Sequence, residues 1–383
     1  MKKLFSVRPF CPAVWKGYGL LWKCLEFLGI EMIEKHKKKR ASYALSLLFP
    51  VLLLLQQIYF ICVFAGLMLQ RGTAIEFNIP TIALCLISIS LWFNIHKKKP
   101  KIRNLVLQFH RLELLNCRST RSLSCVVNTC LAFGVFIMFL ITIGHFNTIP
   151  EIRNDDDIFA ISVFFTIENK NLELAVKLTI CVLNLIVLMF LPSLCVLMCG
   201  SIIFKCSRVL EDFCRDISEW SFQKEELIHH LQKYKLLRQL IHNVSQSLSS
   251  TIFLLLCWQI MSMYPTLASF VNLSKRPVLT NTIWFSVPAL TVIPCSVVGL
   301  ALSASRVQSK QQDVRAALQN IHNCLVTQTE IRWKSLAVVN SMLKISFSTM
   351  SASGIVELKT ELILSIFGSL FTYGLLVLNI KGN

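Results

Sequence analysis

Charged residues are scarce in this sequence, and carboxylates are the scarcest of them. Only 16% of the 383 residues are charged, and 21 Asp and Glu stand against 39 Lys and Arg. A soluble domain would carry roughly 25% charged residues. The deficit is concentrated in apolar blocks of about 20 residues, the length that an α-helix needs to cross a bilayer. We therefore expect an integral membrane protein rather than a soluble one.

The sequence also lacks the motifs of common catalytic and metal sites. It contains no CxxC pair, no GxSxG, no HExxH and no glycine-rich phosphate loop. The 15 cysteines show no paired spacing, so neither a disulfide framework nor a zinc site is indicated. We expect no catalytic residue, no metal and no cofactor, and hence no enzyme. A transporter would usually show internal repeats or paired intramembrane charges, and neither is present.

Seven apolar blocks predict an all-α fold, a seven-helix transmembrane bundle. The blocks cover residues 42–69, 78–95, 123–147, 175–204, 251–273, 283–304 and 360–380. Before them, the stretch Trp15–Ile30 is interrupted by charges and reads as an amphipathic helix at the inner membrane surface. Segment 1–41 is therefore expected to be a cytosolic N-terminal segment, and 42–204 and 251–304 to hold spans one to four and five to six.

Basic residues are divided very unevenly between the two sides of this bundle. Segments 1–41, 96–121, 205–250 and 305–354 carry 31 of the 39 Lys and Arg, whereas the alternate segments carry 7. By the positive-inside rule the basic side is cytosolic. We expect a cytosolic N-terminus, an extracellular C-terminus and a plasma-membrane location. The same distribution explains the net charge of +18 without nucleic-acid binding.

The two longest cytosolic segments carry helical periodicity. Val209, Phe213 and Ile217 recur at helical spacing in 205–250, as do Val314 and Leu318 in 305–359. Neither segment contains enough glycine or proline for a linker. Spans four, five and six are therefore expected to continue as helices into the cytosol, with a break at residues 221–223, and to pack there.

The last block carries one polar stripe on an otherwise apolar helix. Segment 360–383 is expected to hold this seventh span and the extracellular C-terminus. Polar groups in a span normally face the protein interior or a water-filled pathway, so the stripe is either a helix-packing face or a pore lining. A leucine on such a stripe provides an apolar constriction. The stripe consists of Glu361, Ser365, Ser369, Thr372, Leu376 and Asn379.

The end of the chain resembles the signature of the insect gustatory receptors. That signature is Thr-Tyr, five hydrophobic residues, then Gln-Phe, and here Thr372-Tyr373 is followed by five apolar or small residues and Asn379-Ile380. The last pair departs from Gln-Phe but keeps an amide followed by an apolar residue. The run from Phe347 to Leu358 and the stretch Tyr234 to Leu256 are also similar to the family.

The resemblance implies a ligand-gated, non-selective cation channel opened by a small-molecule tastant. It implies a tetramer, of one chain or of related chains, in which the last span lines a central pore and the cytosolic helices form an anchor between subunits. Thr372 and Tyr373 match the start of the motif, and Asn379 and Ile380 would form the extracellular gate ring. The polar stripe lies on the matching face.

The resemblance further implies a ligand pocket within the outer half of each subunit. Such a pocket should combine aromatic side chains with a few polar groups. Each candidate also has a structural role open to it, as an interfacial or interhelical side chain. The candidates in spans three to six are His145, Asn184, Gln259, Tyr264, Trp284 and Phe285.

Two alternatives of similar topology remain at this stage. A G-protein-coupled receptor also has seven spans but needs the opposite orientation, and the sequence has neither Asp-Arg-Tyr after span three nor Asn-Pro-x-x-Tyr in span seven. The insect odorant receptors share the expected architecture, and the Thr-Tyr ending favours the gustatory branch.

Overall fold

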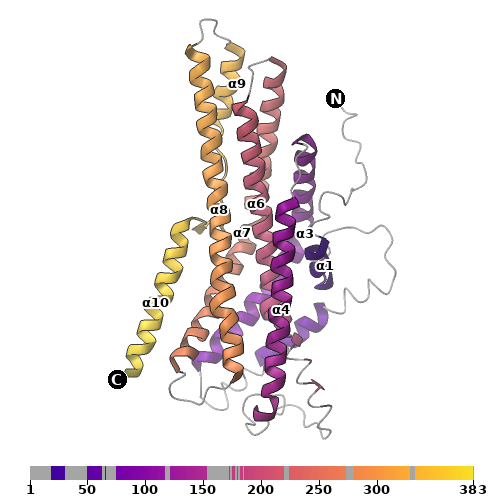
Figure 1. Ribbon diagram of the computed structural model, residues 1–383, viewed down its shortest axis with the longest axis vertical. Coiled ribbons are helices and arrows are strands. Elements are labelled where there is room, and N and C mark those ends of the chain that lie inside the picture. Colours follow the sequence, from indigo (N-terminus) through magenta and orange to yellow (C-terminus); the bar gives the residue numbers. More distant parts are fainter. Residues whose placement is uncertain are drawn as a thin grey trace, which may run out of the picture.

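The chain folds into a bundle of long helices. The computed structural model describes residues 19–30, 50–62, 75–116, 121–152, 185–219, 224–272, 280–327 and 333–382, with a few single positions between them. Helices make up almost all of this part of the chain, and one short β-hairpin precedes the last helix (Figure 1). The expected all-α fold is therefore confirmed.

The elements follow one another in the order that the apolar blocks predict. One helix without a label in Figure 1 spans Pro50–Cys62. The labelled elements are α1 (Gly19–Phe27), α3 (Ile75–Asn116), α4 (Arg121–Ile152), the π-helix η4 (Ile186–Phe190), α6 (Leu191–Ser218), α7 (Lys224–Asn272), α8 (Thr280–Thr327), α9 (Trp333–Lys344), β1 (Ser351–Ala352), β2 (Val356–Glu357) and α10 (Thr360–Gly382).

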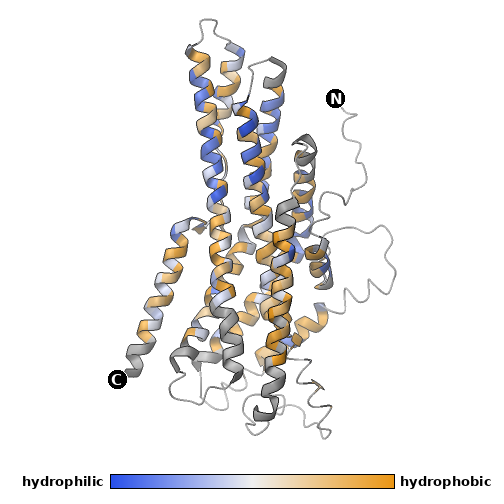
Figure 2. Cartoon of the chain, viewed as in Figure 1, coloured by the Kyte–Doolittle hydropathy of each residue, from blue (hydrophilic) through white to orange (hydrophobic). Residues whose placement is uncertain are grey.

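The central helices are much longer than a bilayer is thick. Helix α7 has 49 residues and α8 has 48, so each is roughly 70 Å long at about 1.5 Å per residue. The hydrocarbon core is only about 30 Å thick. Figure 2 shows that one half of these helices is apolar and the other, which carries α9, is hydrophilic. The expected continuation of the fourth, fifth and sixth apolar blocks as helices is confirmed, and α6 ends and α7 begins on either side of residues 221–223. That these extensions lie in the cytosol stays a prediction.

Within the described residues, three helical stretches are long and apolar enough to cross a membrane. They are Ile186–Ser218, Ile228–Tyr264 and Thr291–Thr327. Three shorter apolar stretches, at Pro50–Cys62, Cys125–Ile141 and Thr360–Leu376, coincide with other expected spans. A membrane protein is therefore supported, while the count of seven spans stays a prediction.

The core runs along the contacts of α6 with α8 and of α3 with α7. Fully buried Met198, Ile202 and Phe213 line α6, and Val297 and Val307 face them from α8. The π-turn η4 comes directly before Pro192, which lacks the N–H that a regular helix would use. The backbone accommodates it with a wide turn, in which the Leu191 N–H donates to the carbonyl of Ile186.

The continuation of α3 beyond the second apolar block was missed from the sequence. The run His96 to Lys99 and Pro100 favours a loop, yet the helix continues to Asn116. The signal for it is a row of apolar residues at helical spacing that are buried in the structure, namely Ile102, Leu105, Val106, Phe109 and Leu112.

The N-terminal helix α1 is amphipathic, as expected, but its apolar face packs on protein. Leu21, Trp22 and Leu25 are buried, and the helix contacts α4 and α6. The Trp92 indole also donates a hydrogen bond to the Leu28 carbonyl at 3.1 Å. The apolar face is therefore covered by the bundle, where the sequence alone predicted contact with the membrane surface.

Candidate functional site

Helix α10 is positioned by the short hairpin that precedes it. β1 and β2 pair in antiparallel register, with Ser351 opposite Glu357. Ser353 and Gly354 both have positive φ, 53° and 71°, and such a turn suits glycine but strains a serine. The hairpin reverses the chain beside α7, and α10 then starts at Thr360 and runs along the apolar half of the bundle (Figure 1). This hairpin was not predicted from the sequence.

A row of polar side chains on α7 holds the segment that leads into the hairpin. His242 Nδ1 and Ser348 Oγ share a hydrogen bond of 3.1 Å. The Ser245 hydroxyl donates to the Thr349 carbonyl at 3.1 Å, and the Ser249 hydroxyl donates to the Ser351 carbonyl at 2.8 Å. We call His242, Ser245, Ser249 and their partners in 348–351 the α7 clasp.

Further contacts reinforce the α7 clasp from its two ends. The Ser353 N–H donates to the Ser249 carbonyl at 3.2 Å, and the Gln311 amide of α8 donates to the Ser348 carbonyl at 3.4 Å. Because the three clasp residues lie three and four positions apart, they form one stripe of α7. The segment that leads into α10 is therefore attached to one face of α7.

Helix α10 has three distinct faces within one chain. Ile366 and Leu370 are buried against α7 and α8. The polar stripe lies beside this packing face and is exposed, at Glu361, Ser365, Ser369, Thr372 and Leu376. The third face is exposed and apolar, with Leu364 76% and Phe371 69% accessible. The side chains of Asn379 and Ile380 lie outside the described residues, although their backbone belongs to α10.

Tyr373 of the terminal motif packs on α7. Its ring meets that of Tyr264 edge to face, with centroids 4.5 Å apart and planes at 84°. Aromatic pairs of this geometry contribute roughly 0.5–1.5 kcal/mol beyond their area burial. The structure thus brings together one expected ligand residue and one motif residue, and places both at the α7–α10 contact.

Gln259 is buried in the α7–α8 contact with one polar atom unmatched. It is 0% exposed, and its amide nitrogen donates to Ser296 Oγ at 2.5 Å. Its Oε1 accepts no hydrogen bond from any residue that the structure describes. The indole N–H of the adjacent Trp258 likewise has no acceptor among these residues. Buried polar atoms normally have a partner, so this turn of α7 has capacity for a polar ligand or a water. Trp258 was missed from the sequence, where it reads as core.

The other expected ligand residues are placed only by their backbone or not at all. Asn184 lies outside the described residues. His145 belongs to α4, and Trp284 and Phe285 belong to α8, but their side chains are outside the described part of the chain. Of the expected ligand residues, the structure places the side chains of Gln259 and Tyr264, five residues apart on α7, where Gln259 contacts α8 and Tyr264 contacts α10.

A partly buried lysine, Lys98, links α3 to α7. The Lys98 ammonium donates to the Ser247 carbonyl at 2.9 Å and to Ser250 Oγ at 2.6 Å. Asn94 completes the network through Ser250 and Thr251, at 3.0 and 2.9 Å. Burial lowers the pKa of Lys98, and the neighbouring Lys101 charge lowers it further. The network fixes the register of the two helices.

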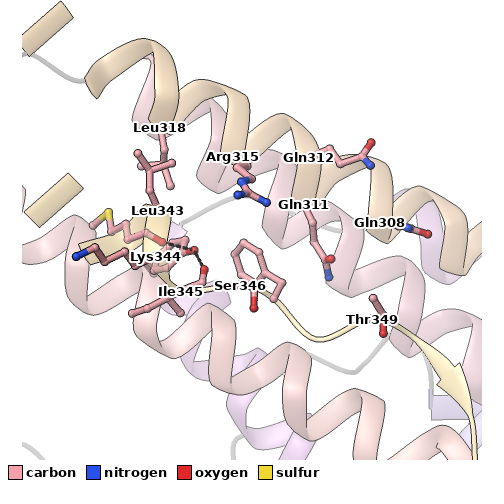
Figure 3. Close-up of a pocket in the computed structure, with 13 residues that line it drawn as sticks. Gln308, Gln311, Gln312, Arg315, Leu318, Leu343, Lys344, Ile345, Ser346 and Thr349 are labelled. Atoms are coloured by element: carbon pink, nitrogen blue, oxygen red, sulfur yellow. Dashed lines mark hydrogen bonds between the residues drawn. The ribbon is translucent and has the colours of Figure 1, made fainter. Parts of the chain in front are cut away.

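A cavity of about 250 Å³ opens between α8 and the chain after α9 (Figure 3). It was missed because its walls come from three distant segments, around Tyr234, Gln308–Leu318 and Met342–Thr349. Tyr234 anchors the floor, since its hydroxyl donates to the carbonyls of Met342 and Ile345, 3.0 and 2.9 Å away. Among the described residues, no group of three or more His, Cys, Asp or Glu is arranged to hold a metal ion.

Comparison with known proteins gives a match in structure but not in sequence. No protein-family profile and no curated protein sequence matches the chain. The olfactory receptor OR5 of the insect Machilis hrabei matches with a TM-score of 0.66 at 14% identity, covering 94% of this chain and 97% of the receptor. The same receptor solved in complex with eugenol gives 0.68 at 15%, covering 96% and 99%. The resemblance read from the terminal motif is thus confirmed at the level of fold: over almost its whole length, this chain is built like an insect olfactory receptor.

Proposed function

We propose that this protein is a subunit of a chemosensory, ligand-gated, non-selective cation channel whose pore is lined by α10. The observation that carries the proposal is the three-faced character of α10. One face packs on its own subunit, one is polar and exposed, and one is apolar and exposed.

In a tetramer with four copies of the chain around a central axis, each of the three faces of α10 has a distinct environment. The stripe from Glu361 to Asn379 faces water in the centre, Leu376 forms an apolar constriction, and Asn379 and Ile380 form the outer gate ring. The apolar face at Leu364 and Phe371 meets a neighbouring subunit or lipid. Homotetramers and mixed tetramers with related subunits both satisfy this geometry.

The topology that we propose places the hydrophilic half of the bundle in the cytosol of a cell, with the protein in the plasma membrane. The N-terminal segment 1–41 and the helical extension 205–250 are cytosolic, and segment 305–359 forms the anchor between subunits. The spans lie in 42–204, 251–304 and 360–383, with the C-terminus outside. The 31 basic residues of the cytosolic segments support this orientation.

The ligand is proposed to be a small molecule bound among the outer halves of spans three to six. The unmatched polar atoms of Trp258 and Gln259 support a site at this depth, and Tyr264 lies five residues further along α7. His145, Asn184, Trp284 and Phe285 complete the proposed pocket. The Thr372-Tyr373 motif favours a tastant, and an odorant is the alternative because the olfactory receptor that matches in structure was solved with eugenol.

The proposal is tested by recording calcium entry and current in cells that express the chain, over panels of tastants and odorants. Ligand-evoked cation current is expected. Leu376→Arg places a ring of cations in the pore and should reduce single-channel conductance at least about twofold. Asn379→Asp should shift selectivity toward calcium.

The matched control is Phe371→Leu on the third face of α10, which should leave conductance unchanged. Unchanged permeation in both Leu376→Arg and Asn379→Asp, with current still evoked, would remove α10 from the pore. Absence of current to every panel despite tetramers at the cell surface would count against the channel itself.

A further inference from the structure

The cavity between α8 and the chain after α9 has walls of one electrostatic character. Its polar lining consists of amides, hydroxyls and two cations, with no carboxylate among the 13 residues that line it. Gln308, Gln311, Gln312 and Arg315 lie at positions i, i+3, i+4 and i+7 of α8 and so form one stripe of that helix. A cavity of this lining favours an anion.

Arg315 has no partner of its own in this part of the structure. In Figure 3 its guanidinium points into the cavity, while the Lys344 amine points away from it. Arg315 makes no ion pair or hydrogen bond with any described residue, and the nearest acid on its helix, Asp313, is paired with Lys310 at 3.0 Å. An arginine aimed into a cavity without a carboxylate has its donors free for a ligand.

The remaining walls suit an organic anion rather than an inorganic one. Opposite α8 lie Ser346 and Thr349, both exposed, and the Phe347 ring, which packs edge-on against Tyr234 at 5.2 Å. The volume of about 250 Å³ exceeds by far the roughly 30 Å³ that a water occupies. There is room for a polar ring against Phe347, with its charged group at Arg315.

We propose that this cavity binds an organic phosphate through Arg315, with Gln308, Gln311, Ser346 and Thr349 around it. The planar guanidinium fork matches two phosphate oxygens at once, and the amide and hydroxyl donors match the others. The proposal does not depend on the channel function. It relies on the proposed topology only in placing the cavity on the cytosolic side, where the phosphate is either a phosphoinositide headgroup or a soluble organic phosphate.

Binding is measured on the purified full-length protein at physiological ionic strength. Soluble inositol trisphosphate is titrated into protein held in phosphatidylcholine nanodiscs, and a fluorescent phosphatidylinositol bisphosphate is titrated into nanodiscs of the same lipid. Arg315→Gln removes the charge that faces the cavity. Arg208→Gln is the matched control, because it removes another exposed arginine, which pairs with Glu211 on α6, outside the cavity.

We expect saturable binding by the wild-type protein, a loss of affinity of at least about tenfold in Arg315→Gln, and an unchanged affinity in Arg208→Gln. The same pattern with the lipid alone identifies the headgroup as the source, and the pattern with both probes identifies a site open to the cytosol. No saturable binding of either probe, or an equal loss in both variants, overturns the proposal. So does a wild-type protein that ignores both probes while Arg315→Gln changes the oligomer seen by native mass spectrometry, because an acid of a neighbouring copy then fills the cavity.

Discussion

The phenol of Tyr234 joins three elements that lie far apart in the sequence. Its ring packs on Phe213 of α6 and on Phe347, and its hydroxyl donates to the carbonyls of Met342, in the last turn of α9, and of Ile345, just after it. Burial raises the pKa of this phenol, so it remains a protonated donor at neutral pH. The carbonyls at a helix end have no partner within the helix, and a donor from outside satisfies them.

Replacing this tyrosine with phenylalanine tests the hydroxyl alone. Tyr234→Phe keeps the packing but removes the phenol donor from the Ile345 carbonyl and from the Met342 carbonyl, which keeps only the Ile345 N–H. It should lower the free energy of unfolding by about 1–3 kcal/mol. Thermal unfolding of the protein in detergent measures the change. Tyr264→Phe is the control, because the Tyr264 hydroxyl makes no hydrogen bond with a described residue. Equal losses in both variants would show that the hydroxyl of Tyr234 is not what stabilises α9.

Substitutions of Gln259 and Ser296 should differ in their effect on stability, although the two side chains bond to each other. Ser296 Oγ donates to the Ile293 carbonyl and accepts from the Gln259 amide. Ser296→Ala leaves that amide buried without a partner and should destabilise the protein by about 1–3 kcal/mol, whereas Gln259→Leu removes both the amide and the unmatched Oε1 and should be nearly neutral. Thermal unfolding of the two variants decides. If Gln259→Leu is the more damaging change, Oε1 has a partner in the folded protein.

At the scale of elements, the α7 clasp is the contact that ties the base of α10 to the bundle. Ser245 and Ser249 bond to backbone carbonyls, so these two contacts depend little on the residue types of 349–351, whereas His242 bonds to the Ser348 side chain. Only the periodicity of His242, Ser245 and Ser249 is visible in the sequence. Their partners lie about 100 residues later in the sequence, after α8 and α9, and only the structure shows that this segment packs on α7.

Removing the clasp should free the segment before α10 without unfolding the helices. In Ser245→Ala with Ser249→Ala, amide hydrogen exchange in 346–358 should become at least about fivefold faster, since two hydrogen bonds of about 1 kcal/mol each are lost. Exchange mass spectrometry on the full chain measures this. Ser303→Ala is the control, because Ser303 bonds only to the Gly299 carbonyl of its own helix. Unchanged exchange in 346–358 would mean that the two serine hydroxyls do not hold the segment before α10.

At the scale of the whole molecule, orientation separates the channel from a G-protein-coupled receptor. An epitope tag placed after Asn383 should be stained in unpermeabilised cells, and a tag placed before Met1 only after permeabilisation. The physical reason is the cost of moving the 31 basic residues of the inner segments to the outside. The opposite staining pattern would rule out the proposed topology and, with it, the outer position of Asn379.

The positions of the apolar helices and of their extensions could be predicted from the sequence. Apolar blocks and helical periodicity predicted α4, α7, α8 and α10 to within several residues, because both signals arise from residues close together in the chain. The Lys run at 97–99 concealed the continuation of α3, since its charge and Pro100 outweighed the buried stripe from Ile102 onward. The hairpin before α10 left no signal, because two paired residues per strand are too few for a period.

The sequence by itself determined the hydropathy of each segment, the uneven distribution of basic residues along the chain and the polar stripe of α10, since hydropathy and charge are properties of the residues themselves. Tertiary structure alone decided which side chains meet. It joined Gln259 to Ser296, seated the chain after α9 on α7 through the clasp, and aimed Arg315 into a cavity that three distant segments enclose. Such sites form where helices pack that are far apart in the chain. No pattern among neighbouring residues predicts that packing.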